Sequence, residues 1–179
     1  MARVLIIGGG CRGRALAAAL VADGHAVRIT TRDSERRASI AGAGAEPFVG
    51  DPDRIGSLME ALAGVTVVCW LLGTATGDPD RVAALHGTRL RFFLEKTVDT
   101  PVRGVVYEAS GTVPAAALAG GRAEAEAAAA TWQIPLAVLT APPGDQAAWL
   151  PAARGAVAGL LRPEPPVGPS GSVSSRAAP

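Results

Sequence analysis

The stretch "VLIIGGGCRG" at residues 4–13 joins a run of four apolar residues to three consecutive glycines. Such a run suits neither a continuous helix nor a continuous strand, so the chain is expected to turn here. Gly8, Gly10 and Gly13 have the spacing G-x-G-x-x-G, and a helical pattern follows over residues 12–23. A strand, a glycine loop and a helix in this order predict the start of a dinucleotide-binding βαβ unit.

Each glycine of this pattern has a physical role. Gly8 permits the tight turn, Gly10 lets a pyrophosphate approach the backbone, and Gly13 allows close packing of helix on strand. Free N–H groups at the helix start would face the phosphates, which places Cys11 and Arg12 beside them. The alternative is an ordinary turn with accidental spacing, in a chain that has 22 glycines.

The rest of the chain alternates short β-rich runs with longer runs rich in alanine and leucine. Strands are expected at residues 3–8, 26–31, 45–49, 65–72, 103–109 and 134–140. Helices are expected at residues 12–23, 34–42 (with Ser34 as N-cap), 51–62, 79–97, 114–131 and about 145–161. This alternation predicts an α/β fold, a doubly wound parallel sheet of the Rossmann type. We expect the strand order 3-2-1-4-5-6, with helices on both faces in three layers.

Composition bounds the kind of protein. With 179 residues, 49% hydrophobic and 18% charged, the chain is expected to pack one dinucleotide-binding domain over residues 1–161. Residues 162–179 are rich in Pro, Ser and Gly and predict a tail. The net charge of +1 gives no basis for a nucleic-acid or membrane surface. No run approaches the roughly 20 apolar residues of a membrane span, and no signal peptide is recognised, so we expect a cytoplasmic location.

The cysteines and histidines give little sign of other chemistry. Cys11 and Cys69 are the only cysteines and are expected to be reduced thiols, Cys69 as a core residue. Cys11 beside Arg12 could serve redox chemistry, but a loop residue near the phosphates is the favoured interpretation. His25 and His86 belong to no Cys/His cluster, so no metal site is predicted.

The end of the second predicted strand distinguishes NADP from NAD. An NAD site usually has a carboxylate there for the ribose 2′-hydroxyl. Thr31 stands in that place and Arg32 follows, whose guanidinium suits a 2′-phosphate. Asp33 has the spacing of an NAD acid but is expected to begin a helix, and Arg36 or Arg37 is expected on a solvated face. NADP is therefore the expected cofactor, with Thr31 and Arg32 among its contacts.

Several later segments extend the pattern beyond the glycine loop. They are "GHAVRITTRDSER" (24–36), "GAEPFVGDPDRIGSLMEALAGVTVV" (44–68), "HGTRLRFFLE" (86–95), "GVVYEASGTV" (104–113) and "GRAEAEAAAATWQIPLAVLTAPPG" (121–144). In order and spacing they resemble the atypical and extended short-chain dehydrogenase/reductases, especially NmrA-like NAD(P)-binding proteins. The resemblance covers about residues 2–145, although most extended members space their glycines as G-x-x-G-x-x-G.

The resemblance implies cofactor contacts at the ends of successive strands. Arg32 matches the arginine that binds the 2′-phosphate, and Asp51 matches the acid that contacts the adenine amino group. Pro52, the next residue, is also expected to contact the cofactor. Leu72 and Gly73 match the turn near the adenine ribose. The alternative for Asp51 is a helix cap without a ligand.

The resemblance also implies positions near the reacting end of the cofactor. Ser110 matches the catalytic serine or threonine, and Pro142 matches the proline near the nicotinamide. The alternative for Ser110 is a turn residue. Glu108, two positions earlier, could be a site acid, but strand surface is the favoured interpretation.

The catalytic Tyr-x-x-x-Lys of the family is absent. Tyr107 and Lys96 are the only tyrosine and lysine, and their order excludes that pair. The aligned positions hold Leu118 and Arg122. Tyr107, in a strand, is not expected to substitute for the missing residue.

Two function classes follow. The first is an NADP(H)-binding dinucleotide or sensor module, which reports to a regulatory protein partner. The second is an NADP-dependent oxidoreductase on a small carbonyl or sugar-like substrate, in which Ser110 orients the carbonyl and Arg122 stabilises negative charge. The missing dyad and the short stretch after residue 145 favour the first. Helices 79–97 and 114–131 match those through which family members pair, so a homodimer is expected.

Overall fold

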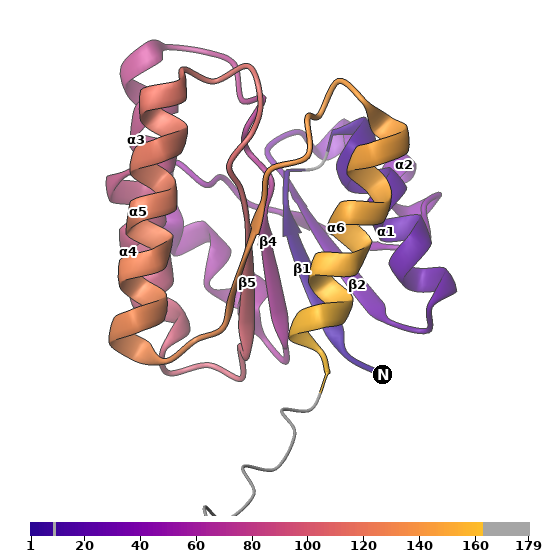
Figure 1. Ribbon diagram of the computed structural model, residues 1–179. Coiled ribbons are helices and arrows are strands. Elements are labelled where there is room, and N and C mark those ends of the chain that lie inside the picture. Colours follow the sequence, from indigo (N-terminus) through magenta and orange to yellow (C-terminus); the bar gives the residue numbers. More distant parts are fainter. Residues whose placement is uncertain (9, 163–179) are drawn as a thin grey trace, which may run out of the picture.

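The computed structural model describes residues 1–8 and 10–162 and contains a six-stranded sheet covered by helices on both faces (Figure 1). The strands are β1 (Arg3–Ile7), β2 (Ala26–Thr31), β3 (Glu46–Val49), β4 (Val67–Trp70), β5 (Gly104–Glu108) and β6 (Leu136–Leu139). Every neighbouring pair is parallel, in the order β3-β2-β1-β4-β5-β6. The predicted Rossmann topology is confirmed. The order in which strands are added to the sheet reverses between β1 and β4, while all strands remain parallel.

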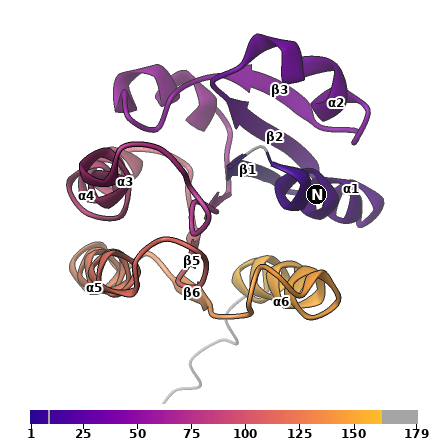
Figure 2. The same ribbon diagram turned by 90° about the horizontal axis from the view of Figure 1, so that it is seen from above.

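The helices form a layer on each face of the sheet (Figure 2). One layer contains α1 (Cys11–Ala22), α2 (Arg37–Ala41) and α6 (Gln146–Leu160). The other contains α3 (Pro79–His86), α4 (Thr88–Thr97) and α5 (Ala115–Trp132). The three predicted layers are therefore confirmed.

β1 shows how the sequence builds both cores at once. Val4 and Ile6 are fully buried under the α1 and α6 layer, whereas Leu5 and Ile7 are fully buried under the opposite layer. Successive side chains of a strand point to opposite faces, so a strand covered on both sides must be apolar throughout. The run "VLII" before the glycines meets this requirement.

The segment predicted as one helix over residues 79–97 forms two helices. α3 ends at His86, Gly87 caps α4, and the backbone at Gly87 (φ −120°, ψ −107°) is not helical. His86 is buried at the end of α3 and contacts the hydroxyl of Tyr107. The break therefore lies where the chain turns a histidine into the core.

The segment predicted as a helix over residues 51–62 is instead two short 3₁₀ turns, η2 (Ile55–Leu58) and η3 (Glu60–Leu62). Side chains compete here for backbone groups, which disfavours a regular helix. The Ser57 hydroxyl donates to the Arg54 carbonyl oxygen at 2.7 Å, and the Asp51 carboxylate accepts from the Asp53 N–H at 3.0 Å.

The segment predicted as a helix over residues 34–42 begins as a 3₁₀ turn, η1 (Ser34–Arg36), before α2. The cap is Asp33 and not Ser34, because the Asp33 carboxylate accepts from the Glu35 N–H at 2.9 Å. The predicted cap was therefore one residue late, whereas the start of the helical segment at residue 34 is confirmed.

The proposed tail lies outside the described residues from 163 onward, so the division at residue 161 stays a prediction. Within residues 1–8 and 10–162, no helix is both long and apolar enough to cross a membrane. Cys69 is buried in the core as predicted, and burial raises the pKa of its thiol to about 12. Cys11 is exposed.

Candidate functional site

A cavity of about 570 Å³ lies where the carboxyl ends of the strands meet the helix starts. Its lining draws on the loops after β1, β2, β3, β4 and β6 and on helices α1, α3 and α6. The lining residues are Gly8, Gly10, Cys11, Arg12, Gly13, Arg32, Arg36, Asp51, Pro52, Asp53, Leu71, Leu72, Thr74, Ala75, Thr76, Gly77, Asp78, Arg81, Val82, Leu85, Pro143, Gly144, Gln146 and Trp149. This edge of a doubly wound sheet, at the reversal of strand order, is where such folds bind ligands.

A second cavity of about 330 Å³ adjoins the first at the ends of β2 and β3. It is lined by Gly8, Thr30, Thr31, Arg32, Asp33, Arg36, Gly50, Pro52 and Leu72. The two cavities share Gly8, Arg32, Arg36, Pro52 and Leu72. Together they form one hollow that runs along the strand ends.

The three glycines of the G-x-G-x-x-G pattern meet different constraints. Gly8 has φ +128°, and a side chain there would overlap the Leu71 carbonyl oxygen. A side chain at Gly13 would overlap the Gly8 carbonyl oxygen. Gly10, the N-cap of α1, is exposed and, apart from the adjoining backbone, has no described atom within 4 Å of where its side chain would start. Gly8 and Gly13 are thus required by the fold, whereas the space beside Gly10 is open toward a ligand.

The end of β2 presents arginines to this hollow. Arg32 is exposed and makes no hydrogen bond or ion pair with another described residue. Thr31 is buried, and its hydroxyl accepts from the Asp33 N–H at 3.1 Å. Asp33 lines the second cavity, but its carboxylate caps η1 and pairs with Arg36 at 3.5 Å. Arg36 is exposed, as expected of a residue on a solvated face, and it also lines both cavities.

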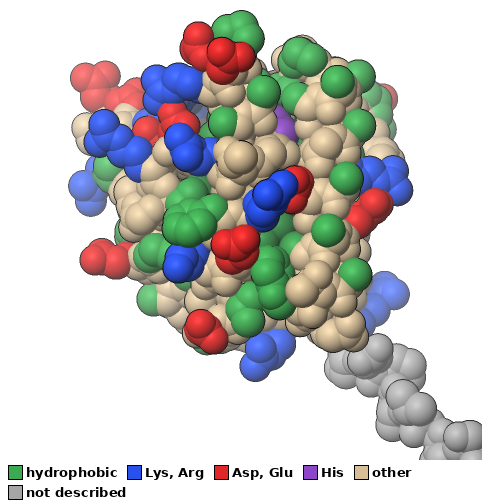
Figure 3. Space-filling view, turned by 90° about the vertical axis from the view of Figure 1, so that its left-hand side faces the viewer, with side chains coloured by type: hydrophobic (Ala, Val, Ile, Leu, Met, Phe, Trp, Pro, Cys, Tyr) green, Lys and Arg blue, Asp and Glu red, His purple; other side chains and the backbone are tan. Residues whose placement is uncertain are grey.

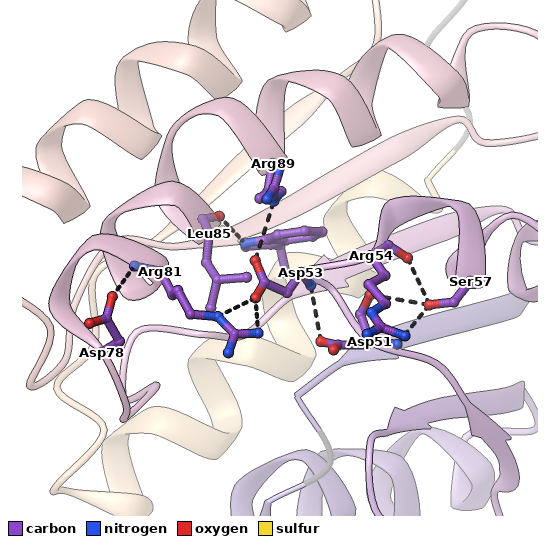
Figure 4. Close-up of polar contacts among 9 residues, drawn as sticks. Asp51, Asp53, Arg54, Ser57, Asp78, Arg81, Leu85 and Arg89 are labelled. Atoms are coloured by element: carbon purple, nitrogen blue, oxygen red, sulfur yellow. Dashed lines mark hydrogen bonds and ion pairs between the residues drawn. The ribbon is translucent and has the colours of Figure 1, made fainter.

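Behind the end of β3, acids and arginines link the loop to α3 and α4 (Figure 4). Asp53 lines the cavity and binds both Arg81 and Arg89, the latter at 3.3 Å. The Arg81 and Arg89 hydrogen bonds hold the pKa of the Asp53 carboxyl below its usual range. Asp78 caps α3 by accepting from the Arg81 N–H at 3.0 Å. Asp51 is half-buried in the same wall, where it both accepts from a backbone N–H and faces the hollow.

Glu108 is the site residue that the sequence analysis placed wrongly. It was favoured as strand surface, but its side chain is 0% exposed at the carboxyl end of β5. One carboxylate oxygen accepts from the Gly73 N–H at 2.8 Å, and the other accepts from the Trp149 indole N–H at 2.9 Å. The Arg12 guanidinium lies 3.4 Å from the latter oxygen. Glu108 thus joins α1, the loop after β4 and α6 directly behind the cavity wall.

The surroundings of Glu108 act on its ionisation in opposite directions. Burial raises the pKa of the Glu108 carboxyl, and this is the largest effect. The Arg12 charge and the N–H groups of Gly73 and Trp149 lower that pKa. All three neighbours are donors or cations, so the arrangement suits the ionised carboxylate. An acid at the end of an otherwise uncharged strand was the available signal, since a buried carboxylate needs such partners.

The remaining predicted residues lie around the cavity or beyond it. Gly73 is buried and touches Glu108 through its N–H, and Ser110 is half-buried with its carbonyl against Gly73. Pro142 is exposed, and its neighbour Pro143 lines the cavity instead. Arg122 is exposed on α5 and binds Glu126 at 2.7 Å. The structure thus brings most of the predicted cofactor contacts together, but Gly73, Pro142, Ser110 and Arg122 are not among the residues that line the two cavities.

A second buried polar cluster lies beneath α5. His86 Nδ1 is 2.7 Å from the Tyr107 hydroxyl, which donates to the Leu118 carbonyl oxygen at 3.1 Å. Burial raises the pKa of Tyr107 and lowers that of His86. A side chain at Gly121 would overlap the Tyr107 hydroxyl, so this glycine makes room for the tyrosine. None of these four residues lines the cavity.

Among the residues described, no group of three or more potential ligands could hold a metal ion.

Comparison with solved structures shows the same fold in longer proteins. Vestitone reductase from alfalfa (Medicago sativa L.) matches with 18% identity and a TM-score of 0.60, over 77% of this chain and 56% of that one. Triphenylmethane reductase from Citrobacter sp., solved with NADP(H), matches with 21% identity and a TM-score of 0.58, over 76% and 48%. UDP-glucose 4-epimerase from Thermotoga maritima matches with 15% identity and a TM-score of 0.62, over 76% and 54%. The chain spans about half the length of these proteins.

The sequence has no match among curated proteins. A family model described as NAD(P)H-binding matches residues 8–120, which is more than half of the chain. The match begins at the glycine loop and extends through β5 into α5, and it therefore contains most of the cavity wall. The resemblance drawn from the sequence is confirmed, and the chain belongs to the NAD(P)H-binding family of Rossmann proteins.

Proposed function

We propose that the hollow binds NADP(H) and that the protein acts as a dinucleotide-binding or sensor module without the usual Tyr-Lys catalysis. The observation that carries the proposal is the continuous hollow from Arg32 and Arg36, past the glycine loop, to Trp149. It offers a cationic end for a 2′-phosphate, an open helix N-terminus for the pyrophosphate and a wider end between α3 and α6. Calorimetric titration with NADPH, NADP⁺, NADH and NAD⁺ tests it directly, and no binding of any of the four would overturn it.

Preference for NADP over NAD is supported by the ends of β2 and η1. Arg32 has no hydrogen-bond or ion-pair partner among residues 1–8 and 10–162, and Arg36 lines the same two cavities. Asp33, the one acid near the expected position, already serves as a cap and as a partner of Arg36. A carboxylate engaged in this way is a poor acceptor for a ribose hydroxyl, whereas a free guanidinium suits a phosphate.

Arg32→Ala should weaken NADPH binding about 10-fold to 100-fold and leave NADH binding within twofold. The lost contact is a charge-assisted hydrogen bond to the 2′-phosphate, worth roughly 1.5–3 kcal/mol, and NADH lacks that group. Arg37→Ala is the matched control, because Arg37 is exposed nearby and does not line either cavity. Equal loss for the two cofactors, measured by calorimetry, would remove the assignment of Arg32.

The sensor proposal rests on what surrounds the reacting end of the hollow. Leu118, at the position of the family's tyrosine, is buried against Val82 and Val113. Arg122, at the position of its lysine, points to solvent with Glu126. The rival proposal is an oxidoreductase with another proton donor, and it is supported by the reductases among the matched folds. In that case Ser110 and Arg122 would act as predicted from the sequence.

We also propose a homodimer through the layer of α4 and α5. Phe92 on α4 is 46% exposed and Val98, which follows it, is 44% exposed. Figure 3 looks onto this layer and shows hydrophobic side chains among charged ones of both signs. A surface on which exposed apolar side chains lie among charged ones suits a small interface between two copies of this chain.

The dimer predicts that Phe92→Glu yields a monomer while the fold is kept. A half-exposed side chain can take a charge without disturbing the core, but two such charges brought together across a symmetric interface repel each other. Light scattering at micromolar concentration measures the mass, and Val49→Glu on β3 is the control because Val49 is 49% exposed and outside this layer. A monomeric wild-type protein would contradict the proposal.

A further inference from the structure

The Arg12–Glu108 pair is an arrangement that the glycine pattern does not explain. Arg12 stands between Gly10 and Gly13, and its side chain is 14% exposed while that of Glu108 is 0% exposed. The Arg12 guanidinium also donates to the Thr74 hydroxyl at 2.9 Å and lies 5.1 Å above the Trp149 ring. A glutamate, a hydroxyl and an indole from three different elements therefore fix one arginine in place.

The held guanidinium keeps donors for a ligand. Both the Thr74 hydrogen bond and the Glu108 ion pair use Nη2 of Arg12. Its Nε and Nη1 atoms have no hydrogen-bond partner among the residues described, and Arg12 lines the cavity. An arginine has five N–H donors in a rigid planar fork, so this one still has in-plane N–H donors for an anion.

The position of Arg12 selects which part of a dinucleotide it can reach. Its partners Glu108 and Trp149 belong to β5 and α6, on the β4 and β5 side of β1. Arg32 and Arg36, proposed for the 2′-phosphate, lie on the opposite side, after β2. A dinucleotide that spans the hollow from Arg32 across the glycine loop therefore brings its second phosphate, on the nicotinamide side, toward Arg12.

Glu108 itself does not line the cavity. It can act on a bound ligand only through the groups that it holds, of which Arg12 is the cation. Without the carboxylate, the guanidinium would lose its charged partner among the described residues, which opposes its rotation toward solvent. A flexible arginine loses more side-chain entropy on binding than a fixed one, so its contact with a phosphate is weaker.

We propose that Glu108 is a positioning residue that holds Arg12 ready for the nicotinamide-side phosphate of the bound dinucleotide. The inference rests on the proposed cofactor binding and assigns the contact to one phosphate. It requires that the two residues act as one unit, so that Glu108 has no effect once Arg12 is gone. It also requires that substitution of either residue leaves the affinity for ligands without that phosphate unchanged.

The test is a double-mutant cycle read by calorimetry with two ligands. The variants are Glu108→Gln, Arg12→Ala and the double variant, and the ligands are NADPH and adenosine 2′,5′-bisphosphate, which lacks the nicotinamide-side phosphate. Each single variant should weaken NADPH about 10-fold, in the range of one charge-assisted hydrogen bond, and leave the bisphosphate within twofold. In the Arg12→Ala background, Glu108→Gln should change NADPH affinity less than twofold. Glu124→Gln is the matched control, since Glu124 pairs with Arg91 away from the cavity.

Glutamine at position 108 turns an N–H₂ group toward the Trp149 indole N–H, which can disturb folding. If Glu108→Gln does not fold, the same comparison is made between Trp149→Phe and Trp149→Phe with Glu108→Gln, because phenylalanine removes the opposing donor. The 10-fold difference in NADPH affinity is expected within that background too, in the range of one charge-assisted hydrogen bond.

The outcomes separate this inference from the cofactor proposal. Wild-type protein that binds neither NADPH nor NADH overturns the proposed function, and the inference falls with it. Wild-type binding with additive losses in the double variant, or with equal losses for both ligands, overturns the positioning role alone. Losses confined to NADPH and absent in the Arg12→Ala background support it.

Discussion

Gly10→Val should reduce NADPH affinity at least about 100-fold and leave the protein folded, a loss of roughly 2.7 kcal/mol or more. The backbone at Gly10 has φ −66° and ψ −175°, an extended conformation that valine adopts readily. Apart from the adjoining backbone, no described atom lies within 4 Å of the side-chain position, so the folded protein has room for it. That room is the cavity at the start of α1, where a pyrophosphate would accept from the free N–H groups.

The neighbouring glycines give the contrast that makes this prediction specific. Alanine at Gly8 would have to adopt φ +128° and would overlap the Leu71 carbonyl oxygen. Alanine at Gly13 would overlap the Gly8 carbonyl oxygen. Both substitutions should therefore lower the unfolding temperature, whereas Gly10→Val should leave it nearly unchanged. A folded Gly10→Val protein with wild-type affinity by calorimetry would exclude the glycine loop as the phosphate site.

The parts of the fold that the sequence predicts well are those with a strong periodic or local signal. "VLIIG" and "VTVVCWLL" are apolar runs that only a doubly covered parallel strand accommodates, and both form central strands. The glycine loop can be predicted from the sequence because the backbone itself requires glycine at Gly8 and Gly13, where a side chain would overlap a carbonyl oxygen. The lining residues Gly10, Arg32 and Asp51 followed from strand ends, which in a parallel sheet all meet at one edge.

The errors arise where long-range contacts override local preference. The segment 51–62 contains enough apolar residues for a helix, yet Ser57 and Asp51 bond the backbone and leave only 3₁₀ turns. Glu108 was read as strand surface because single-sequence periodicity cannot show an indole and a guanidinium arriving from α6 and α1.

The second large effect concerns chemistry. Steady-state NADPH oxidation on a panel of ketones, aldehydes and sugars should be absent or very slow. General acid–base assistance is typically worth about 10²-fold to 10⁴-fold in rate, and a tyrosine assisted by lysine supplies it in the enzymes that this chain resembles. Among the described residues that line the cavity there is no tyrosine, lysine or histidine. Asp51, Asp53 and Asp78 are the acids there, and two of them are engaged by arginine or by the α3 start.

Three other residues could in principle donate a proton, namely Tyr107, His86 and Glu108, but none of them lines the cavity. The Tyr107 hydroxyl is committed to the Leu118 carbonyl oxygen, and burial raises its pKa further from neutrality. His86 is buried against the same hydroxyl, and burial lowers its pKa, so it is neutral at physiological pH. Glu108 is separated from the hollow by the Arg12 and Trp149 side chains that line it.

The comparison variant for this prediction is Leu118→Tyr with Arg122→Lys, which restores the family's residue types at the aligned positions. Turnover should remain low in that variant too, because Leu118 packs into a buried cluster and Arg122 faces solvent, and neither lines the cavity. A rate increase of 100-fold or more would show that α5 reaches the nicotinamide and that only the side chains are missing. Robust turnover by the wild-type protein would instead require a donor in this chain. In that case Glu108→Gln and Cys11→Ser would be compared first at saturating NADPH, because Glu108→Gln is also expected to weaken cofactor binding. A loss of turnover confined to Glu108→Gln under that condition would point to the buried carboxylate as the proton source and exclude the non-catalytic proposal.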